Sequence, residues 1–371
     1  MNILFLTWKD VRHPHAGGAE RVMLEYAKWL VSRGHEVTWF ASSFHGGEDE
    51  AIIDGIKIIR RYTQHTIWMG AWWWYRKYKK SHPVDIIIDE AGGWPLLAPL
   101  YEKDTPLFFF IHHIPEKEFD IVPFPFSWVI RWMYHMMIRC YRNTPTITVS
   151  SSTRDELIHD FRFHPSSIFI IENTTEIIPL ESIDFDTRVH DIVFLGRLTP
   201  IKRPDHAIWA FVHALRDIPG DARLHIIGNP QDKKYVSSLH ALVENLDIED
   251  RVVFHGFLDT PEYQSLLWDA RLMLVPSEKE GYGLVVIEGN AYGLPVIAYD
   301  VPWLRNSVKS HENGILIPDG DIAAMGRAIV EMFANEEAYR ILARKSLSHV
   351  RSIPKWKDQV EKLEKIILEK L

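Results

Sequence analysis

The chain has 371 residues, of which 46% are hydrophobic and 25% charged, a balance that is typical of a globular protein and excludes a disordered one. Its formal net charge of −8 argues against a dedicated nucleic-acid binder, so we expect no nucleic-acid partner. The single cysteine excludes an internal disulfide and a cysteine-based zinc site, and it indicates a reducing compartment.

The amino terminus carries no basic leader before a long apolar run, so we expect no signal peptide. The longest stretch without a charged residue, residues 62–75, has 14 residues, fewer than the ~20 that cross a bilayer. We therefore expect a soluble protein that is either free in the cytoplasm or associated with the inner face of the membrane.

Short apolar runs recur along the chain, and continuous runs of this length are typical of parallel strands that are buried on both faces. We predict strands at residues 3–8, 37–41, 85–89, 107–111, 146–150, 168–171, 192–196, 224–228, 252–256, 272–276, 295–299 and 315–318. Helical stretches lie between many of them, at residues 19–33, 203–216, 234–245, 261–270 and 321–334. Strands that alternate with helices indicate two α/β domains with doubly wound parallel sheets.

Residues 172–188 mix acidic, threonine and proline residues with little periodicity, which indicates a linker. We predict an N-terminal domain at residues 1–180 and a C-terminal domain at residues 181–354. Ten of the 14 tryptophans lie in residues 1–180, so the two domains differ in surface chemistry. Residues 355–371 predict an amphipathic helix, which we expect to pack back on the N-terminal domain.

The strongest local motif runs from Glu280 through Gly281, Tyr282, Gly283 and Leu284 to Glu288 and follows the strand at residues 272–276. Glycines in a strand-to-helix loop let the backbone approach a ligand, and amides at a helix start favour phosphate. The two carboxylates could accept hydrogen bonds from sugar hydroxyls. A helix cap with a packing glycine is the alternative.

A second motif, residues 196–204, directly follows the strand at residues 192–196. Arg197 and Lys202 could clamp a diphosphate, since arginine forks onto two oxygens and lysine acts as a point charge. We expect Arg203 to point elsewhere. An ordinary solvated turn with surface cations is the alternative.

Two further candidates lie in the first half of the chain. Gly17 and Gly18 follow the first strand and open the first helix, an arrangement that binds anions, although neither a dinucleotide fingerprint nor a Walker loop is present. The strand at residues 107–111 ends in His112 and His113 at the carboxyl edge, where open α/β sheets bind ligands. Adjacent histidines face opposite sides of a strand, and a purely structural histidine is the alternative.

The motifs occur in a fixed order: the glycine loop, Gly196-Arg197-Leu198 with Lys202, Ile226-Ile227-Gly228, and Glu280 to Glu288 before Gly293-Leu-Pro-Val-Ile-Ala298. In this order they resemble the retaining, GT-B-fold glycosyltransferases of family 4 (glycosyl transferases group 1), over nearly the whole chain. The resemblance implies two facing Rossmann-like domains with a cleft between them. The C-terminal domain would hold a nucleotide-diphospho-sugar, and the N-terminal domain would present the acceptor.

The resemblance also implies residue roles. Arg197 and Lys202 match the pair that neutralises the donor diphosphate in place of a metal. Glu288 matches the carboxylate that binds the ribose, and Glu280 matches the one near the donor sugar. The implied donor-binding set is Gly17, Gly18, Arg197, Lys202, Gly228, Glu280, Gly281, Tyr282, Gly283, Leu284 and Glu288. The implied catalytic set is His112, Glu280, Arg197 and Lys202; His112 would position the sugar and stabilise charge, and whether His112 or His113 faces the sugar stays open.

Two Asp-x-Asp pairs, Asp184 with Asp186 and Asp319 with Asp321, could in principle hold a divalent cation. The first lies in the predicted linker and the second just before a helix, where aspartate caps are common. We interpret both as structural and predict neither a metal nor another cofactor.

The segment from Trp68 to Lys80 combines tryptophans with basic residues, which suits a membrane interface with anionic headgroups. Stacking of an acceptor sugar on the tryptophans is the alternative. Residues 126–142, read as a helix, carry a basic stripe, and we interpret this segment as a buried helix whose stripe reaches solvent; a second membrane interface is the alternative. The functional prediction is a retaining hexosyltransferase that uses a nucleotide-sugar and a lipid-linked or membrane-proximal glycan acceptor; a sugar-nucleotide epimerase, a phosphorylase and a silent binding protein are the alternatives.

Overall fold

The computed structural model describes residues 1–115, 119 and 122–370. Contacts between residues divide the chain into two units, Met1–Asn173 together with Pro354–Leu371, and Thr174–Ile353. The chain leaves the first unit within the predicted linker of residues 172–188, slightly before residue 180, and returns to it at Pro354. Leu371, the last residue of the predicted C-terminal helix, lies outside the described residues.

The first unit is built on one eight-stranded sheet. Its strands are β1 (Asn2–Leu6), β2 (Glu36–Ala41), β3 (Glu50–Ile53), β4 (Ile56–Arg60), β5 (Ile86–Glu90), β6 (Leu107–Ile111), β7 (Thr146–Thr148) and β8 (Ile168–Ile170). They lie in the order β3-β4-β2-β1-β5-β6-β7-β8, and only β3 runs antiparallel to its neighbour. The strand order reverses between β1 and β5, the place where doubly wound sheets bind ligands.

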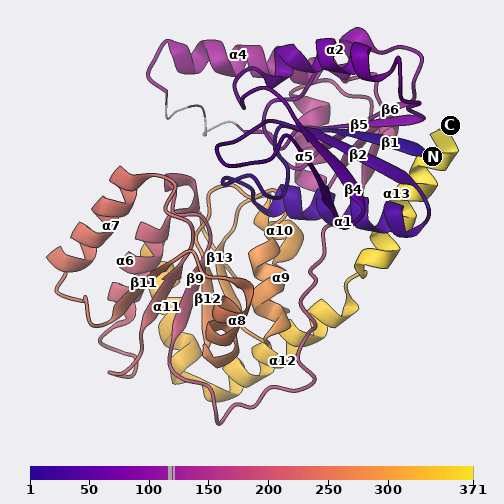
Figure 1. Ribbon diagram of the computed structural model, residues 1–371. Helices are drawn as coiled ribbons and strands as arrows, with labels where there is room; N and C mark the ends of the chain where they lie inside the picture. Colours follow the sequence, from indigo (N-terminus) through magenta and orange to yellow (C-terminus); the bar gives the residue numbers. More distant parts are fainter. Residues whose placement is uncertain (116–118, 120–121, 371) are drawn as a thin grey trace. The chain divides into compact units, whose positions relative to one another are not determined.

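Helices cover both faces of this sheet (Figure 1). On one face lie α1 (Gly18–Ser32) and α13 (Trp356–Lys370), and Tyr26 of α1 contacts both Phe110 of β6 and Trp356 of α13. On the other face lie α2 (Ile67–Tyr78), α3 (Ala98–Tyr101) and α4 (Phe126–Arg139), followed by α5 (Ser151–His159) between β7 and β8. Tyr141, just after α4, stacks on Phe109, and adjacent residues of a strand point to opposite faces.

The second unit is built on a six-stranded, fully parallel sheet. Its strands are β9 (Ile192–Leu195), β10 (Leu224–Ile227), β11 (Val252–Gly256), β12 (Leu272–Val275), β13 (Val296–Tyr299) and β14 (Gly314–Ile317), in the order β11-β10-β9-β12-β13-β14. Its helices are α6 (Pro204–Ala214), α7 (Lys233–Asn245), α8 (Thr260–Asp269), α9 (Leu284–Ala291), α10 (Leu304–Ser307), α11 (Ile322–Ala334) and α12 (Glu336–Ser352). The order reverses between β9 and β12, and the predicted class of two doubly wound α/β domains is confirmed.

The hairpin of β3 and β4 is absent from the sequence prediction. Its turn consists of Asp54 and Gly55, both with positive φ (50° and 80°), as a type I′ turn requires. The signal was present, because Asp-Gly between short apolar segments is typical of a hairpin. It was missed because β3 and β4 are short, include charged residues and lack the continuous apolar runs of the buried strands.

The aromatic segments of the first unit also differ from expectation. The prediction of a buried helix at residues 126–142 is wrong, since α4 exposes large apolar side chains such as Trp128 and Trp132. In α2, by contrast, Trp74 stacks on Phe40 at a ring-centroid distance of 3.9 Å, and the exposed tryptophan is Trp73. None of the helices in the described part of the chain is long and apolar enough to cross a membrane.

A buried ion pair anchors the loop that follows β1. Arg60 at the end of β4 donates from Nε and Nη2 to the carboxylate of Asp10, at 2.6 and 2.9 Å, and from Nη1 to the carbonyl of Glu48, at 2.8 Å. The same carboxylate accepts the backbone N–H of Arg12. Both charged side chains are almost fully buried, at 2% and 0% exposure, so each depends on the other for its hydrogen bonds.

We expect Arg60→Met to lower the free energy of unfolding by about 3–5 kcal/mol, because it leaves the Asp10 carboxylate buried without its partner. Urea unfolding measures this loss. The matched control is Arg61→Met, whose pair with Glu50 is 36% and 52% exposed and contributes at most ~1 kcal/mol. Equal effects of the two substitutions would contradict the assignment of Arg60 as an anchor.

Candidate active site

In the second unit, the loops after β9 and β12 lie at the point where the strand order reverses. Arg197 and Lys202 belong to the loop after β9, and Glu280 belongs to the loop after β12. The backbone N–H of Glu278 donates to the carbonyl of Ile201 at 2.9 Å, which joins the two loops. Two motifs that are far apart in the sequence therefore share one edge of the sheet.

Lys202 and Glu280 form an ion pair at this edge. The Nζ atom of Lys202 lies 2.5 Å from Oε1 of Glu280, and both side chains are largely buried, at 11% and 14% exposure. Lys202 also donates to the carbonyl of Lys279 at 3.1 Å, and the Ser277 hydroxyl donates to Glu280 at 2.9 Å. Arg197 is exposed. The site thus holds a fixed lysine, a fixed carboxylate and an accessible guanidinium.

Helix α9 begins directly after Glu280, Gly281 and Tyr282. Gly283 caps it with φ of +81°, and a Cβ at this position would lie 2.6 Å from the Ser307 hydroxyl oxygen, so glycine is needed there. The first N–H groups of a helix have no intrahelical partner, and its amino end attracts anions. Leu284 and Glu288 are four residues apart and therefore share one side of α9.

Gly228, at the end of β10, has a packing reason to be glycine. A Cβ there would lie 1.7 Å from the carbonyl oxygen of Gly196 at the end of β9. The N–H of Gly196 donates to the carbonyl of Ile227 at 2.9 Å, so the two strand ends are held together. The absence of a side chain at Gly228 lets β9 and β10 stay paired up to the ligand-binding edge.

The remaining charged groups of the predicted motifs have structural partners. Arg203 pairs with Glu278 at 3.2 Å and with Asp319 at 2.5 Å. Asp321 caps α11 by accepting the N–H of Ala324, and Asp184 accepts the N–H of Asp186. Within residues 1–115, 119 and 122–370, no group of three or more His, Cys, Asp and Glu side chains is arranged to hold a metal ion.

In the first unit, Gly17 and Gly18 stand at the amino end of α1 as predicted from the motif, but a carboxylate of the protein already lies there. The N–H of Gly17 donates to Oε2 of Glu20 at 2.7 Å. Glu20 is 4% exposed, and its Oε1 lies 3.2 Å from Nζ of Lys9. Glu20 thus accepts the N–H of Gly17, as the glutamate of a capping box does, and forms an ion pair with Lys9 at the start of α1.

His112 follows β6 and faces Glu90, the last residue of β5. His112 Nε2 lies 3.7 Å from Glu90 Oε1, and both side chains are buried, at 5% and 2% exposure. Burial, with the charge of His113, lowers the pKa of His112 to about 3. Burial, with the charges of Glu20 and Asp89, raises the pKa of Glu90 well above its usual value. His112 is therefore neutral at neutral pH, and this contact is not an ion pair.

Neither polar atom of this contact has a hydrogen-bond partner in the described part of the chain. Gly92 leaves room for the Glu90 carboxyl group, because a Cβ at this position would lie 2.4 Å from Glu90 Oε1. A buried polar atom without a partner is costly, so Glu90 Oε1 and His112 Nε2 at the carboxyl edge of the sheet suggest a functional role.

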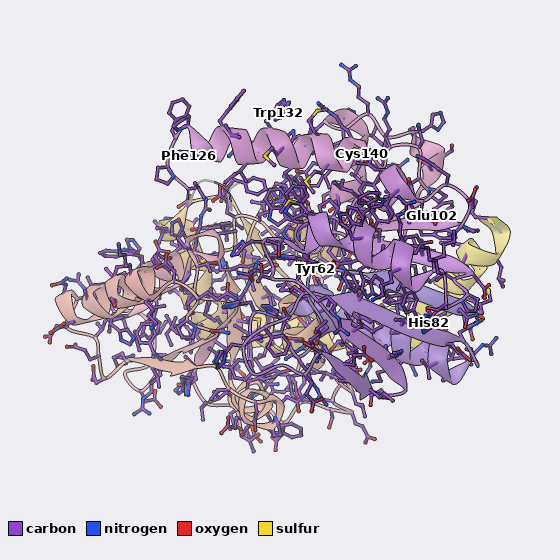
Figure 2. All side chains as sticks on the ribbon, turned by 45° about the horizontal axis from the view of Figure 1, so that its top comes forward. Tyr62, His82, Glu102, Phe126, Trp132 and Cys140 are labelled. Atoms are coloured by element: carbon purple, nitrogen blue, oxygen red, sulfur yellow. The ribbon has the colours of Figure 1, made fainter. Side chains whose placement is uncertain are left out.

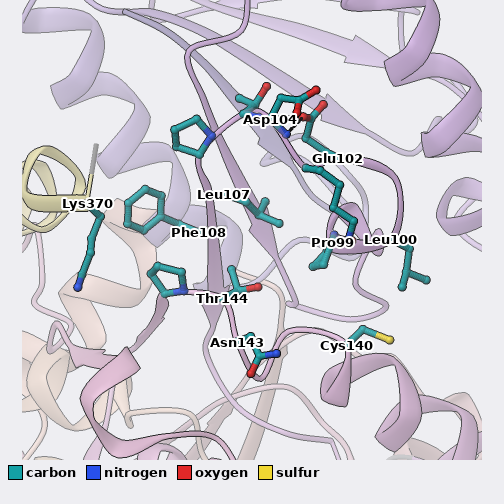
Figure 3. A pocket seen from close by; sticks show the side chains of 14 residues that line it. Pro99, Leu100, Glu102, Asp104, Leu107, Phe108, Cys140, Asn143, Thr144 and Lys370 are labelled. Carbon is teal, nitrogen blue, oxygen red and sulfur yellow. Dashed lines mark hydrogen bonds between the residues drawn. The ribbon is translucent and has the colours of Figure 1, made fainter.

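The first unit also has a hollow of about 570 Å³, lined among others by Glu102, Asp104, Thr144 and Lys370 (Figure 3). Leu107, which begins β6, and Pro145, which precedes β7, line it as well. It therefore lies at the amino ends of these strands, opposite to the carboxyl edge that carries His112. The hollow is distinct from the candidate site.

Two family models match successive parts of the chain. The model described as Glycosyltransferase Family 4 matches residues 16–177, and the model described as Glycosyl transferases group 1 matches residues 180–348. Together they cover both units and all of the motifs above. The chain belongs to the glycosyltransferases of family 4. The family resemblance of the motifs is thereby confirmed.

Curated relatives of this glycosyltransferase match it in part. A D-inositol 3-phosphate glycosyltransferase of Acidothermus cellulolyticus is 34% identical over 143 residues, which are 37% of this chain and 32% of the relative. A poly(glycerol-phosphate) alpha-glucosyltransferase of Bacillus subtilis is 27% identical over 192 residues, 50% of this chain and 28% of the relative. The matches span about a third of the length of these relatives.

Solved structures share the fold of this glycosyltransferase over its full length. Sucrose-phosphate synthase from Thermosynechococcus elongatus is 20% identical with a TM-score of 0.80, covering 100% of this chain and 99% of that one. WaaG, a glycosyltransferase involved in lipopolysaccharide biosynthesis, is 16% identical with a TM-score of 0.77 and 99% coverage of both chains. Anabaena HepE in complex with UDP-glucose is 18% identical with a TM-score of 0.77 and 100% coverage of both. These likenesses establish the GT-B fold.

Three buried charged residues near the first sheet's edge are absent from the sequence-based site: Lys9, Glu20 and Glu90. Each had a weak signal. Lys9 lies just after the first predicted strand, Glu20 lies next to the glycine pair, and Glu90 directly follows the predicted strand at residues 85–89. Their mutual proximity depends on strand order, which no local pattern reveals.

The pKa shifts predict opposite pH dependence of stability for the two unpaired groups. Burial raises the pKa of Glu90 above its value of 4.5 in the unfolded chain, so the unfolded chain ionises first and this residue lowers stability as the pH rises. We expect the melting temperature of Glu90→Gln, relative to the unsubstituted protein, to increase as the pH rises above 4.5. Thermal melts across this range measure the difference.

The pKa shift of His112 predicts the opposite pH dependence of stability. This histidine stays neutral in the folded chain while the unfolded chain binds a proton below pH 6.5, so the unsubstituted protein loses stability as the pH falls from 6.5 toward 3. We expect His112→Asn to gain relative stability over the same interval. The exposed residues Glu244 and His45 provide control substitutions to Gln and Asn. Flat difference curves for Glu90→Gln and His112→Asn would show that the two groups titrate normally.

Proposed function

We propose that the protein is a retaining hexosyltransferase that moves a hexose from a nucleotide-diphospho-sugar to a hydroxyl of a lipid-linked or membrane-proximal glycan. The observation that carries the donor part is the Lys202–Glu280 pair beside Arg197, at the reversal of strand order and next to the start of α9. Cations and helix amides suit a diphosphate, and carboxylates suit sugar hydroxyls. The fold likeness to HepE, whose structure contains UDP-glucose, supports the same class of donor.

In the proposed reaction, the second unit stabilises the leaving group. Negative charge grows on the diphosphate as the bond between sugar and phosphate breaks, and Lys202 with Arg197 would stabilise that charge. The carboxylate of Glu280 would hold the donor sugar and that of Glu288 the ribose, both by accepting hydrogen bonds from hydroxyls. No step of this scheme needs a metal, and we propose that catalysis is metal-independent.

In the first unit, His112 would position the sugar through its imidazole. Efficient general bases titrate near the working pH. A histidine with a pKa of about 3 is therefore poorly suited to act as a general base at neutral pH. A neutral ring still donates from one nitrogen and accepts at the other. This supports a role in orientation and charge stabilisation, which is the role that the family resemblance implies.

Ligand-induced thermal shift tests the donor class. We expect one of UDP, GDP, ADP and CDP to raise the melting temperature by several degrees, since a ligand at 100 times its Kd adds ~2.7 kcal/mol. EDTA should leave the shift unchanged. A shift with NAD alone, or with no nucleoside diphosphate, would contradict the proposal. Turnover of the matching sugar nucleotide without acceptor would instead favour an epimerase, and turnover with free phosphate a phosphorylase.

Substitution tests the leaving-group role. We expect Lys202→Ala to lower kcat by about 100- to 1,000-fold, the loss typical when one group that stabilises transition-state charge is removed. The control is Lys233→Ala, an exposed lysine at the start of α7, which should retain full activity. Circular dichroism checks that both variants are folded. Full transfer activity in Lys202→Ala would remove this residue from the proposed mechanism.

A further inference from the structure

The outer side of α4 and its entry loop is formed by large apolar side chains. We call this surface the α4 face; it consists of Phe124, Phe126, Trp128, Val129, Trp132 and Met136, which are between 40% and 83% exposed. The spacing of Trp128, Trp132 and Met136 places them on one side of the helix. Figure 2 shows Phe126 and Trp132 on the outer side of α4.

The inner side of α4 is apolar as well. Tyr134, Met137 and Ile138 are buried against the sheet, and Tyr134 packs edge-on against Trp94. A helix that covers a sheet usually turns polar residues outward, whereas α4 has large apolar side chains on its outer side as well, next to its basic stripe. Exposed apolar side chains that adjoin one another mark a surface that contacts another phase or molecule.

The charged residues in the chain segment that carries the α4 face are all basic. Residues 121–154 contain no aspartate or glutamate, and Arg139 and Arg142 are exposed at the carboxyl end of α4. The same holds for α2, on the same face of the sheet: residues 62–84 contain no acidic residue, and its exposed side chains include Met69, Trp73 and Arg76. This positive surface belongs to a chain with a net charge of −8.

An anionic membrane fits this combination better than a second copy of the chain. Two copies that met through this surface in a symmetric dimer would place like charges together. A bilayer surface instead takes up tryptophan, phenylalanine and methionine at the level of the headgroups, while arginine and lysine contact anionic lipids. The apolar residues lie on the outer sides of helices and not in a groove, as contact with an extended surface requires.

We propose that the α4 face inserts at the headgroup level of an anionic bilayer, with the basic ends of α4 and α2 in contact with lipid phosphates. The α4 face is therefore the principal membrane contact, and the segment from Trp68 to Lys80 contributes only its outer residues. This inference rests on the proposed function and adds the surface through which the protein would approach a membrane-proximal acceptor. Its test measures binding alone, so its failure is distinguishable from a failure of the transferase proposal.

Vesicle flotation of the full chain tests this inference. We expect flotation with vesicles of phosphatidylcholine and phosphatidylglycerol, weaker flotation with phosphatidylcholine alone, and release in high salt. The variant Trp128→Ser/Trp132→Ser should lose binding by at least about tenfold, because each indole removed from the interface weakens binding by about that factor. Arg139→Glu/Arg142→Glu should weaken binding to the anionic vesicles only.

The matched control is Trp268→Ser, an exposed tryptophan of the second unit at 50% exposure, against 56% for Trp132; it should float like the unsubstituted protein. Thermal melts verify folding, and Trp73→Ser separates α2 from α4. Absence of flotation with anionic vesicles would overturn the proposal, as would undiminished flotation of Trp128→Ser/Trp132→Ser. A dimer in light scattering that this variant dissociates would assign the α4 face to a second copy instead.

Discussion

Parallel strands end at one edge of a sheet, and the reversal of strand order at that edge determines where each candidate binding region lies. In the second unit the reversal between β9 and β12 brings Lys202 to Glu280. In the first unit the reversal between β1 and β5 brings Lys9 within electrostatic range of Glu90. The helices, the helix caps and the glycines keep the strand ends close together, so that side chains from different loops come into contact.

At both edges a buried lysine is paired with a carboxylate of the same unit. Lys202 is paired with Glu280, Lys9 is paired with Glu20, and burial raises the pKa of Glu90 well above its usual value. A phosphate or a hydroxyl that enters such a site exchanges an internal partner for an external one, so the lysines never stand as isolated buried charges. This compensation also keeps the side chains in fixed positions before a ligand arrives, which lowers the entropy that binding must remove.

Sequence patterns predicted the features that are local. Buried parallel strands need continuous apolar runs, and all of the predicted strands are present; the glycine at Gly283 follows from a positive φ in a strand-to-helix turn. Local sequence patterns did not reveal the contacts between segments that are distant in the chain. The packing of Gly228 on Gly196 and the contact of His112 with Glu90 depend on strand order. The exposure of α4 was mispredicted because the sequence of an apolar helix does not show whether protein or lipid covers its apolar side chains.

The position of α13 has a consequence for how the protein is made. This helix packs on α1 of the first unit, where Trp356 meets Tyr26 and Glu364 lies near His35, yet it follows the entire second unit in the chain. On the ribosome, the first unit therefore emerges early but remains without one of its covering helices until synthesis has passed through the second unit. During that interval the apolar side of α1 is exposed and accessible to chaperones. The first unit therefore cannot complete its fold before the second unit has been synthesised.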